Sequence, residues 1–193
     1  MGRIITLDST FVMAEPAAGA YAAGDEISND TTAGDVVRPT FNLAGFTRGR
    51  VLQASMDITP ASGNLVITAL NLDLLIFKTV DVPAAVGDQV TFPITGAQRR
   101  KCVARFLFDD GGWQNPLGAY TAGTSGYQVV SVGNPVPLGT PTLYDTYSHA
   151  GHFDFTGDLE SARTLTAALQ VLAAWTPGAV VNTFGIRLVV EAE

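Results

Sequence analysis

An alternation of apolar and polar residues constrains the fold of this chain more than any other feature. In RVLQASMDITP, residues 50–60, apolar side chains occupy every second position. A β-strand directs successive side chains to opposite faces, so this period of two indicates a strand with one buried face. A turn sequence, ASGN, follows, and the run that comes next again has apolar residues at alternate positions. We therefore predict a β-hairpin formed by residues 50–59 and 65–78.

The same pattern recurs near the C-terminus. Leu52-Gln53 and Thr59-Pro60 are separated by five residues, and so are Leu169-Gln170 and Thr176-Pro177. Before the second Thr-Pro pair, one face of an extended chain would carry Leu165, Ala167, Leu169, Val171, Ala173 and Trp175. We predict a second pair of strands, 165–175 and 183–193, despite the alanine content of the first, because burial outweighs intrinsic preference. The alternative is a helix from about Leu159 to Trp175, with Leu165, Leu169 and Leu172 at helical spacing.

Substitutions by aspartate distinguish these two interpretations. In a strand, Leu169→Asp would be severe and Gln170→Asp mild, because only Leu169 faces the core. In a helix, Ala168 and Leu172 would share the buried stripe, so changing either of them to Asp would be as damaging as Leu169→Asp.

Turn residues divide the rest of the chain into short segments. Twenty glycines and ten prolines leave little room for long helices. Further candidate strands are 26–28, 36–42, 89–93, Cys102–Phe108, 127–132 and 151–155. With 193 residues, this spacing predicts one all-β domain, an antiparallel β-sandwich or jelly roll over 21–193. Residues 1–20, with Ala, Gly and Pro at 14–20, are expected to form an extended N-terminal arm that can lie across a neighbour.

Residues 106–162 differ in composition from the rest of the chain. They contain no Lys or Arg but hold four of the five tyrosines and both histidines. We predict a loop-rich insertion here, since Tyr and Trp give large contact areas at low entropic cost. The predicted interface residues are Trp113, Tyr120, Tyr127, Tyr144 and Tyr147.

The overall charge restricts the possible partners. Eighteen acidic and eleven basic residues give a net charge of −7, which argues against nucleic-acid binding. No run approaches the roughly 18 apolar residues of a membrane span, and no signal peptide is recognisable. The single cysteine, Cys102, cannot form an internal disulfide, so we expect folding in a reducing compartment. The 47% apolar and 15% charged residues indicate a surface partly covered by partners.

Candidate chemical motifs are weak. His149 and His152, with Asp145, Asp154 and Asp158 nearby, resemble a metal site, but positions i and i+3 of a strand lie on opposite faces. The acidic residues Asp25, Glu26, Asp30 and Asp35 lack the spacing of a calcium loop, and we interpret them as a solvated turn.

Two further charged motifs also have simpler interpretations. Asp109-Asp110 reads as a turn and not as a glycosidase pair, and Arg99-Arg100-Lys101 reads as a solvated strand edge. We predict no catalytic residues, no cofactor and no enzymatic activity.

Several segments together resemble virion proteins encoded by tailed bacteriophages. The shared positions are Tyr21, Gly24, Asp25, Ile27, Arg48, Gly49, Arg50, Thr176, Pro177, Phe184, Arg187 and Leu188. The resemblance implies a β-sandwich component of the head or tail, with a capsid decoration or cementing protein as the first expectation. Its implied partners are the major capsid protein or other virion subunits and further copies of itself, with a trimer favoured. It would be made in the bacterial host cytoplasm and located in the virion.

Two alternatives from other functional classes remain open at this point. A carbohydrate-binding or receptor-binding tail module would stack Trp113, Tyr120, Tyr144 and Tyr147 on sugar rings. A metal-dependent jelly-roll enzyme would use His149 and His152.

Overall fold

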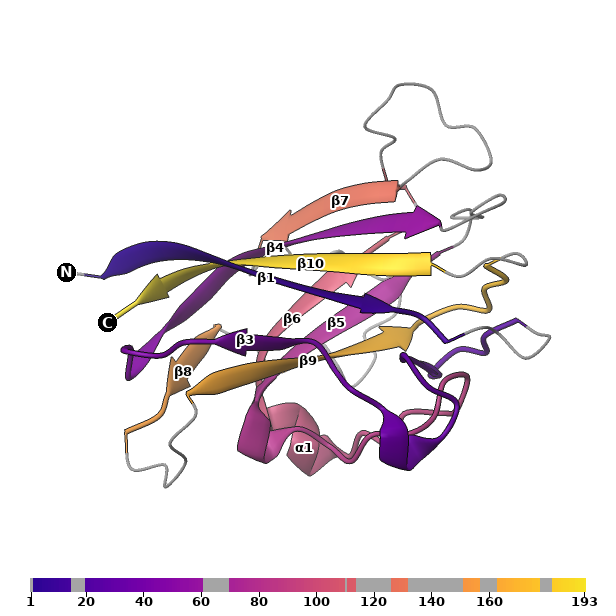
Figure 1. Cartoon of the computed structure of the whole chain (residues 1–193), viewed down its shortest axis with the longest axis horizontal. Helices are drawn as coiled ribbons and strands as arrows, with labels where there is room; N and C mark the ends of the chain where they lie inside the picture. The colour runs from indigo at the N-terminus through magenta and orange to yellow at the C-terminus, as the bar shows by residue number, and fades with distance from the viewer. Residues whose placement is uncertain are drawn as a thin grey trace.

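Two antiparallel β-sheets face each other in the computed structural model (Figure 1). The structure describes residues 2–14, 20–60, 70–109, 111–113, 126–131, 151–156, 163–177 and 182–193. This arrangement confirms the predicted all-β sandwich. No helix among the described residues is long and apolar enough to cross a membrane.

The first sheet has the order β1, β10, β4, β7, with β8 also paired to β4. Its strands are β1 (Arg3–Val12), β10 (Asn182–Ala192), β4 (Arg48–Pro60), β7 (Gly126–Ser131) and β8 (His152–Asp154). β1 pairs with β10 over its whole length, from Arg3 opposite Ala192 to Val12 opposite Thr183. The chain ends lie at the same end of the molecule (Figure 1).

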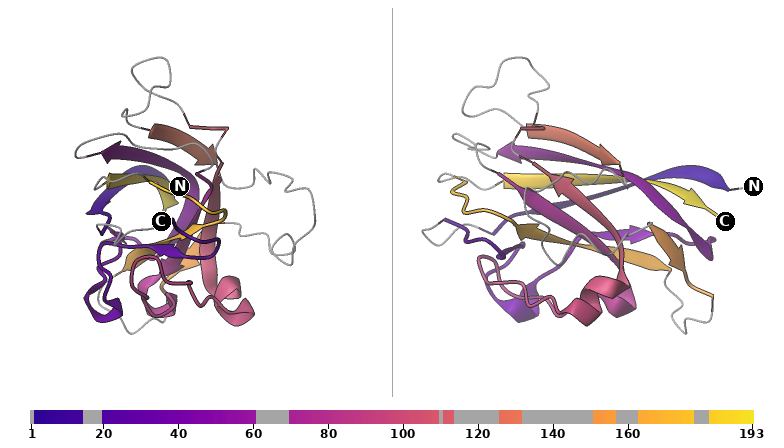
Figure 2. Two further views of the ribbon diagram at one scale, coloured as in Figure 1. Left: turned by 90° about the vertical axis from the view of Figure 1, so that its right-hand side faces the viewer. Right: turned by 180° about the vertical axis from the view of Figure 1, so that it is seen from behind.

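The second sheet has the order β2, β9, β5, β6, with β3 also paired to β9. Its strands are β2 (Glu26–Ile27), β3 (Thr40–Asn42), β9 (Thr164–Val171), β5 (Leu72–Lys78) and β6 (Cys102–Phe108). The short helices are α1 (Gly96–Lys101), η1 (Ala33–Asp35) and η2 (Thr79–Asp81). Figure 2 shows α1 at the margin of the molecule, away from the first sheet.

The order in which the chain visits the two sheets is that of a jelly roll. β2 and β3 lie along the same side of β9, and β7 and β8 lie along the same side of β4, so the described strands occupy eight positions. Numbered along the chain, these positions run 1-8-3-6 in one sheet and 2-7-4-5 in the other. This alternation is the double Greek key of eight-stranded jelly rolls.

The main core fills the space between the sheets. It includes the fully buried side chains Tyr21, Phe41, Met56, Ile58, Phe106, Phe108, Trp175 and Phe184. A second, smaller cluster covers the outer face of the second sheet, where Leu75, Phe77, Cys102 and Ala168 pack against residues of the 82–94 segment. The second sheet is therefore buried on both faces.

The two predicted hairpins are wrong, although their strands exist. β4 belongs to the first sheet and β5 to the second, and β9 and β10 are likewise in different sheets. Each Leu-Gln…Thr-Pro segment thus precedes a crossing from one sheet to the other. Alternation reports which face of a strand is buried, and it does not identify the strand that pairs with it.

Residues 164–171 form a strand, which rules out the helical alternative. The expectation that Gln170 faces solvent is wrong. Gln170 is buried and its Nε2 donates to the Gly24 carbonyl oxygen at 3.0 Å. Ala168 is also buried, at 1% exposure, so Ala168→Asp no longer separates a helix from a strand here. Both side chains lie on the outer face of the second sheet, which other segments of the chain cover.

Residues 89–93 do not form the predicted strand, since only an isolated bridge joins Asp25 to Thr91. Gln89 adopts a positive φ of 59°, which breaks an extended run. The chain then forms α1, which the sequence prediction omitted. Thr95 and Gln98 form a capping box at its start, so the basic run 99–101 ends a helix.

The N-terminal segment and the 106–162 region both contribute strands. Residues 3–12 of the expected arm form the edge strand β1, and residues 15–19 lie outside the described part. The region 106–162 supplies the end of β6, the whole of β7 and the whole of β8. Its remaining described residues include Trp113, which is buried.

Candidate interaction surface

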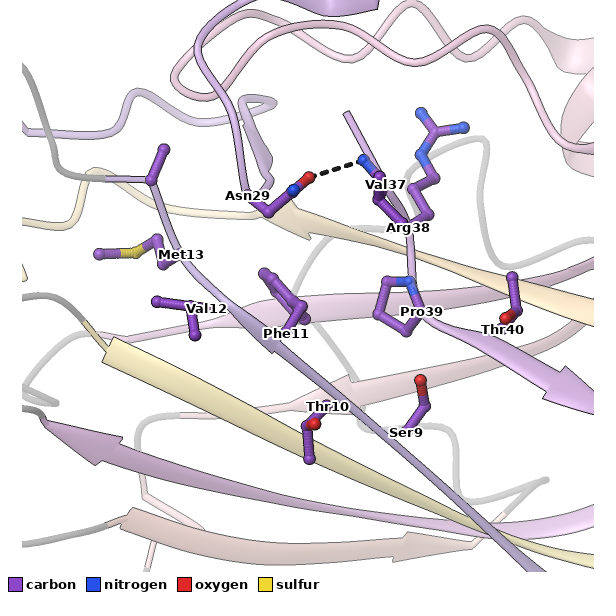
Figure 3. Close-up of a pocket in the computed structure, with 11 residues that line it drawn as sticks. Ser9, Thr10, Phe11, Val12, Met13, Asn29, Val37, Arg38, Pro39 and Thr40 are labelled. Atoms are coloured by element: carbon purple, nitrogen blue, oxygen red, sulfur yellow. Dashed lines mark hydrogen bonds between the residues drawn. The ribbon is translucent and has the colours of Figure 1, made fainter. Parts of the chain in front are cut away.

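A groove runs between β1 and the segment that leads into β3 (Figure 3). It has a volume of about 620 Å³ and is lined by residues 9–14, Asn29 and residues 37–40. Phe11 and Pro39 lie on its two sides (Figure 3). Asn29 fixes the second wall, because its Oδ1 accepts a hydrogen bond from the Val37 amide at 2.7 Å. The groove therefore lies where an edge of one sheet meets an edge of the other.

The groove exposes apolar side chains on both walls. Val12 is 50% exposed and Val37 is 69% exposed. The cation at the groove is Arg38, and its guanidinium is held by the Glu26 carboxylate, with Nε 2.6 Å from Oε1. Because this charge is already paired, the groove favours an uncharged, apolar partner segment.

Behind the groove, three carboxylates are buried. Two of them, Asp25 and Glu26, were expected in a solvated turn, whereas Asp30 of the same predicted turn is half-buried and Asp35 is exposed. Asp25, Glu26 and Asp88 are each at most 5% exposed. Asp88 accepts a hydrogen bond from the Tyr21 hydroxyl at 2.6 Å and another from the Ser28 amide at 2.8 Å. Burial raises the pKa of Asp88 to about 6. Burial, followed by the charge of Asp88, also raises the pKa of Tyr21 above its usual value.

This carboxylate network fixes the second wall of the groove. Glu26 also accepts from the Val86 amide, so the 82–94 segment is tied to β2. The Arg38 guanidinium lies 5.0 Å from the centre of the Phe92 ring. The sequence signal for this network was the pair of Asp25 and Glu26 beside Tyr21, but nothing in it linked them to Arg38 or Asp88.

The predicted interface aromatics divide into two groups. Trp113 is 5% exposed, stacks on Phe108 with ring centroids 5.9 Å apart, and donates its Nε1 hydrogen to the Leu70 carbonyl at 2.9 Å. Its assignment to an interface is therefore corrected, since Trp113 packs in the core. Tyr127 lies in β7. Tyr120, Tyr144 and Tyr147 lie outside the described residues.

The histidine motif can be placed only in part. His152 is exposed at the start of β8 and is paired in register with Arg50, whereas His149 lies outside the described residues. The Asp154 carboxylate accepts from the Thr156 amide at 2.7 Å, and hydrogen bonding from the Thr156 side chain, followed by that from its amide, lowers the pKa of Asp154. Within the described residues no group of three or more His, Cys, Asp or Glu side chains is placed to hold a metal ion.

A smaller cleft near the chain ends carries mixed charge. It is lined by Arg48, Arg50, His152, Asp154, Glu191 and Glu193 and has a volume of about 400 Å³. Arg48 Nε lies 3.1 Å from Glu193 Oε2, and both side chains are largely exposed. Exposed pairs of this kind contribute little to stability. Sequence reasoning missed this cleft because its residues come from β4, β8 and β10.

Known proteins resemble this chain only weakly. No protein-family model and no curated protein sequence matches the chain. Similar solved structures include the 60-mer capsid protein of beak-and-feather disease virus, at 13% identity and a TM-score of 0.34, covering 100% of this chain and 94% of that one. Another is mud crab tombus-like virus, at 11% identity and a TM-score of 0.28, covering 100% and 90%. A third is turnip yellow mosaic virus, at 9% identity and 0.25, covering 99% and 96%. TM-scores this low do not establish a shared fold or function.

Proposed function

We propose that this protein is a structural component of a phage virion that decorates or cements the capsid through protein–protein contacts. The observation that carries the proposal is the groove between β1 and residues 37–40, which offers exposed valines and a charge that is already paired. A surface of this kind suits contact with another protein better than contact with a charged small molecule.

The topology supports the same class of function by analogy. Jelly rolls occur in viral capsid domains, in lectins and in cupins, so the fold alone does not select one of these. The groove and the resemblance of the sequence to tailed-phage virion proteins favour the first of them. The proposed partner is the major capsid protein or another virion subunit. The protein would be made in the host cytoplasm and act as an oligomer on the capsid, with a trimer as the proposed number.

The experiment measures binding to capsids. Phage particles produced without this protein are mixed with the purified chain, and bound protein is quantified after sedimentation. Val37→Asp places a charge in the groove and is expected to reduce binding at least tenfold. Val80→Asp is the matched control, because Val80 is similarly exposed, at 51%, but lies in η2, outside the groove. Wild-type protein that does not bind capsids would overturn the proposal.

A second arm tests the proposed tyrosine contacts. Tyr120, Tyr127, Tyr144 and Tyr147 are changed to Ser together, and capsid binding is compared with that of Val37→Asp. A loss of binding in both variants would assign both surfaces to the capsid contact. Binding to a glycan array without binding to capsids would instead support the receptor-binding alternative, for which the burial of Trp113 removes one stacking residue.

A further inference from the structure

We propose that the free edge of β1 pairs with β1 of a second copy of this chain, antiparallel and about a two-fold axis at Asp8. The first sheets of the two copies would then form one continuous sheet. The inference does not require the virion role, since a dimer of this kind forms between isolated chains. It is also separate from the proposed trimer, because a two-fold contact uses a different symmetry axis.

The backbone of β1 has one side available. Within the described part of the chain, β10 is its only hydrogen-bonded neighbouring strand. Met13, just after β1, donates its amide to the Asn182 carbonyl at 2.8 Å, which fixes which residues face β10. In an antiparallel ladder the bonded residues alternate, so the odd-numbered residues bond to β10. The amide and carbonyl groups of Ile4, Thr6, Asp8, Thr10 and Val12 therefore point to the free edge.

The side chains of these five residues are self-complementary. In order they are β-branched apolar, Thr, Asp, Thr and β-branched apolar, which is symmetric about Asp8. Antiparallel pairing about that residue places Ile4 opposite Val12 and Thr6 opposite Thr10. Both kinds of cross-strand pair are favourable. A two-fold contact between identical surfaces requires this self-complementarity.

The groove provides a position for the incoming strand. In this register, Ile4 of the second copy lies beside Val12 at the mouth of the groove, near Val37. These three residues are 57%, 50% and 69% exposed in the single chain. Pairing would cover apolar side chains that otherwise face water, and covering them favours association.

The charge of Asp8 is expected to weaken the contact between the two β1 strands. Two Asp8 side chains would lie opposite each other, which is unfavourable for like charges. Each is already paired with Arg187 of its own chain, at 2.7 Å between Nε and Oδ1, so the repulsion is reduced but not removed. Removal of this charge should therefore tighten the dimer.

Sedimentation equilibrium of the full-length chain at micromolar concentrations provides the test. We expect a concentration-dependent monomer–dimer equilibrium for the wild type. Thr6→Pro should weaken the dimer at least tenfold with little change in the thermal unfolding midpoint, because the amide that it removes faces the free edge and not β10. Asp8→Thr should strengthen the dimer several-fold. A wild type that stays monomeric, or Thr6→Pro dimers as tight as those of the wild type, would overturn the proposal.

A disulfide variant gives an independent result if Thr6→Pro fails to fold. Asp8→Cys should form a disulfide-linked dimer under mild oxidation, because residues at a two-fold in paired strands lie within disulfide reach. Val80→Cys is the control, and the native Cys102 is buried at 6% exposure. Cross-linking of Val80→Cys as fast as of Asp8→Cys would contradict the proposed axis. The second copy would lie at the mouth of the groove that is proposed to contact the capsid, so capsid binding is also measured with Thr6→Pro, which weakens the dimer and leaves Val37 unchanged. Failure of the dimer and failure of the virion role are then distinguishable.

Discussion

The outer faces of the two sheets differ in burial, and the strands that form them differ in sequence: β4 alternates apolar and polar residues, whereas β5 is apolar at all but two of its seven positions. On β4 of the first sheet, the outward positions Asp57 and Thr59 are exposed. On the second sheet, outward positions such as Leu75, Phe77 and Ala168 are at most 2% exposed, because the 82–94 segment covers them. A strand in the second sheet therefore has two buried faces, and its polar side chains need partners within the protein.

The largest expected effect tests this difference between outer faces. Ala168→Asp places an unpaired carboxylate under the 82–94 segment and should lower the free energy of unfolding by about 4 kcal/mol. Thr59→Asp, at an exposed outward position of β4, should change it by less than about 0.5 kcal/mol. Urea denaturation measures both. Similar values for the two variants would mean that the cover over the second sheet opens readily.

The next effect concerns the ion pair that anchors this cover. Arg38 and Glu26 have side chains only 7% and 1% exposed. Arg38→Met removes one partner and leaves Glu26 buried, so we expect the free energy of unfolding to fall by about 3 kcal/mol. Arg38→Met with Glu26→Gln should recover part of this loss. If the double variant is no more stable than Arg38→Met, the buried charge of Glu26 is not the cause.

The third effect is a pH dependence of the free energy of unfolding, and it arises from Asp88 in the 82–94 segment. The pKa of Asp88 is raised to about 6, so the folded chain holds this proton more tightly than the unfolded chain. The stability that this proton gives is complete below the ordinary pKa of 3.8 and is lost as pH rises through about 6. A shift of about two pKa units corresponds to roughly 2–3 kcal/mol.

Asp88→Asn isolates this contribution. The amide can still accept from the Ser28 amide and can donate to the Tyr21 hydroxyl, but it carries no charge. Urea midpoints at pH 4.5 and pH 7.5 should therefore fall less with rising pH in the variant than in the wild type. Equal pH dependence in both proteins would contradict the assignment to Asp88.

The smallest expected change in stability concerns an ion pair on the exposed outer face of the first sheet. Asp8 and Arg187 form an ion pair whose side chains are 60% and 59% exposed. Asp8→Asn should change the free energy of unfolding of the monomer by less than about 0.5 kcal/mol, and salt should reduce even this change. A loss as large as that of Arg38→Met would show that β1 is held to β10 by this pair and not by its backbone hydrogen bonds.

The sequence predicted the strands better than their partners. β6 begins at Cys102 and ends at Phe108 as expected, because CVARFLF is a nearly continuous apolar run with a charged run before it and Asp109 after it. The pairing of β4 with β10 and β7 was not predictable, since it joins residues far apart in the chain. The groove was even harder to predict from the sequence. The groove depends on β1 and residues 37–40 meeting at a sheet corner, and no local pattern records that contact.

By itself, the sequence determined that the chain forms short strands with a buried face, because alternation of apolar residues has a direct local cause in strand geometry. Only the tertiary structure decided that the outer face of the second sheet is also buried, that Trp113 belongs to the core and that Asp88 lies beside Tyr21. These outcomes depend on which segments, distant in sequence, come together. Contacts between such segments decide which side chains are buried, how far the pKa of a carboxyl group shifts and which strand edges stay exposed.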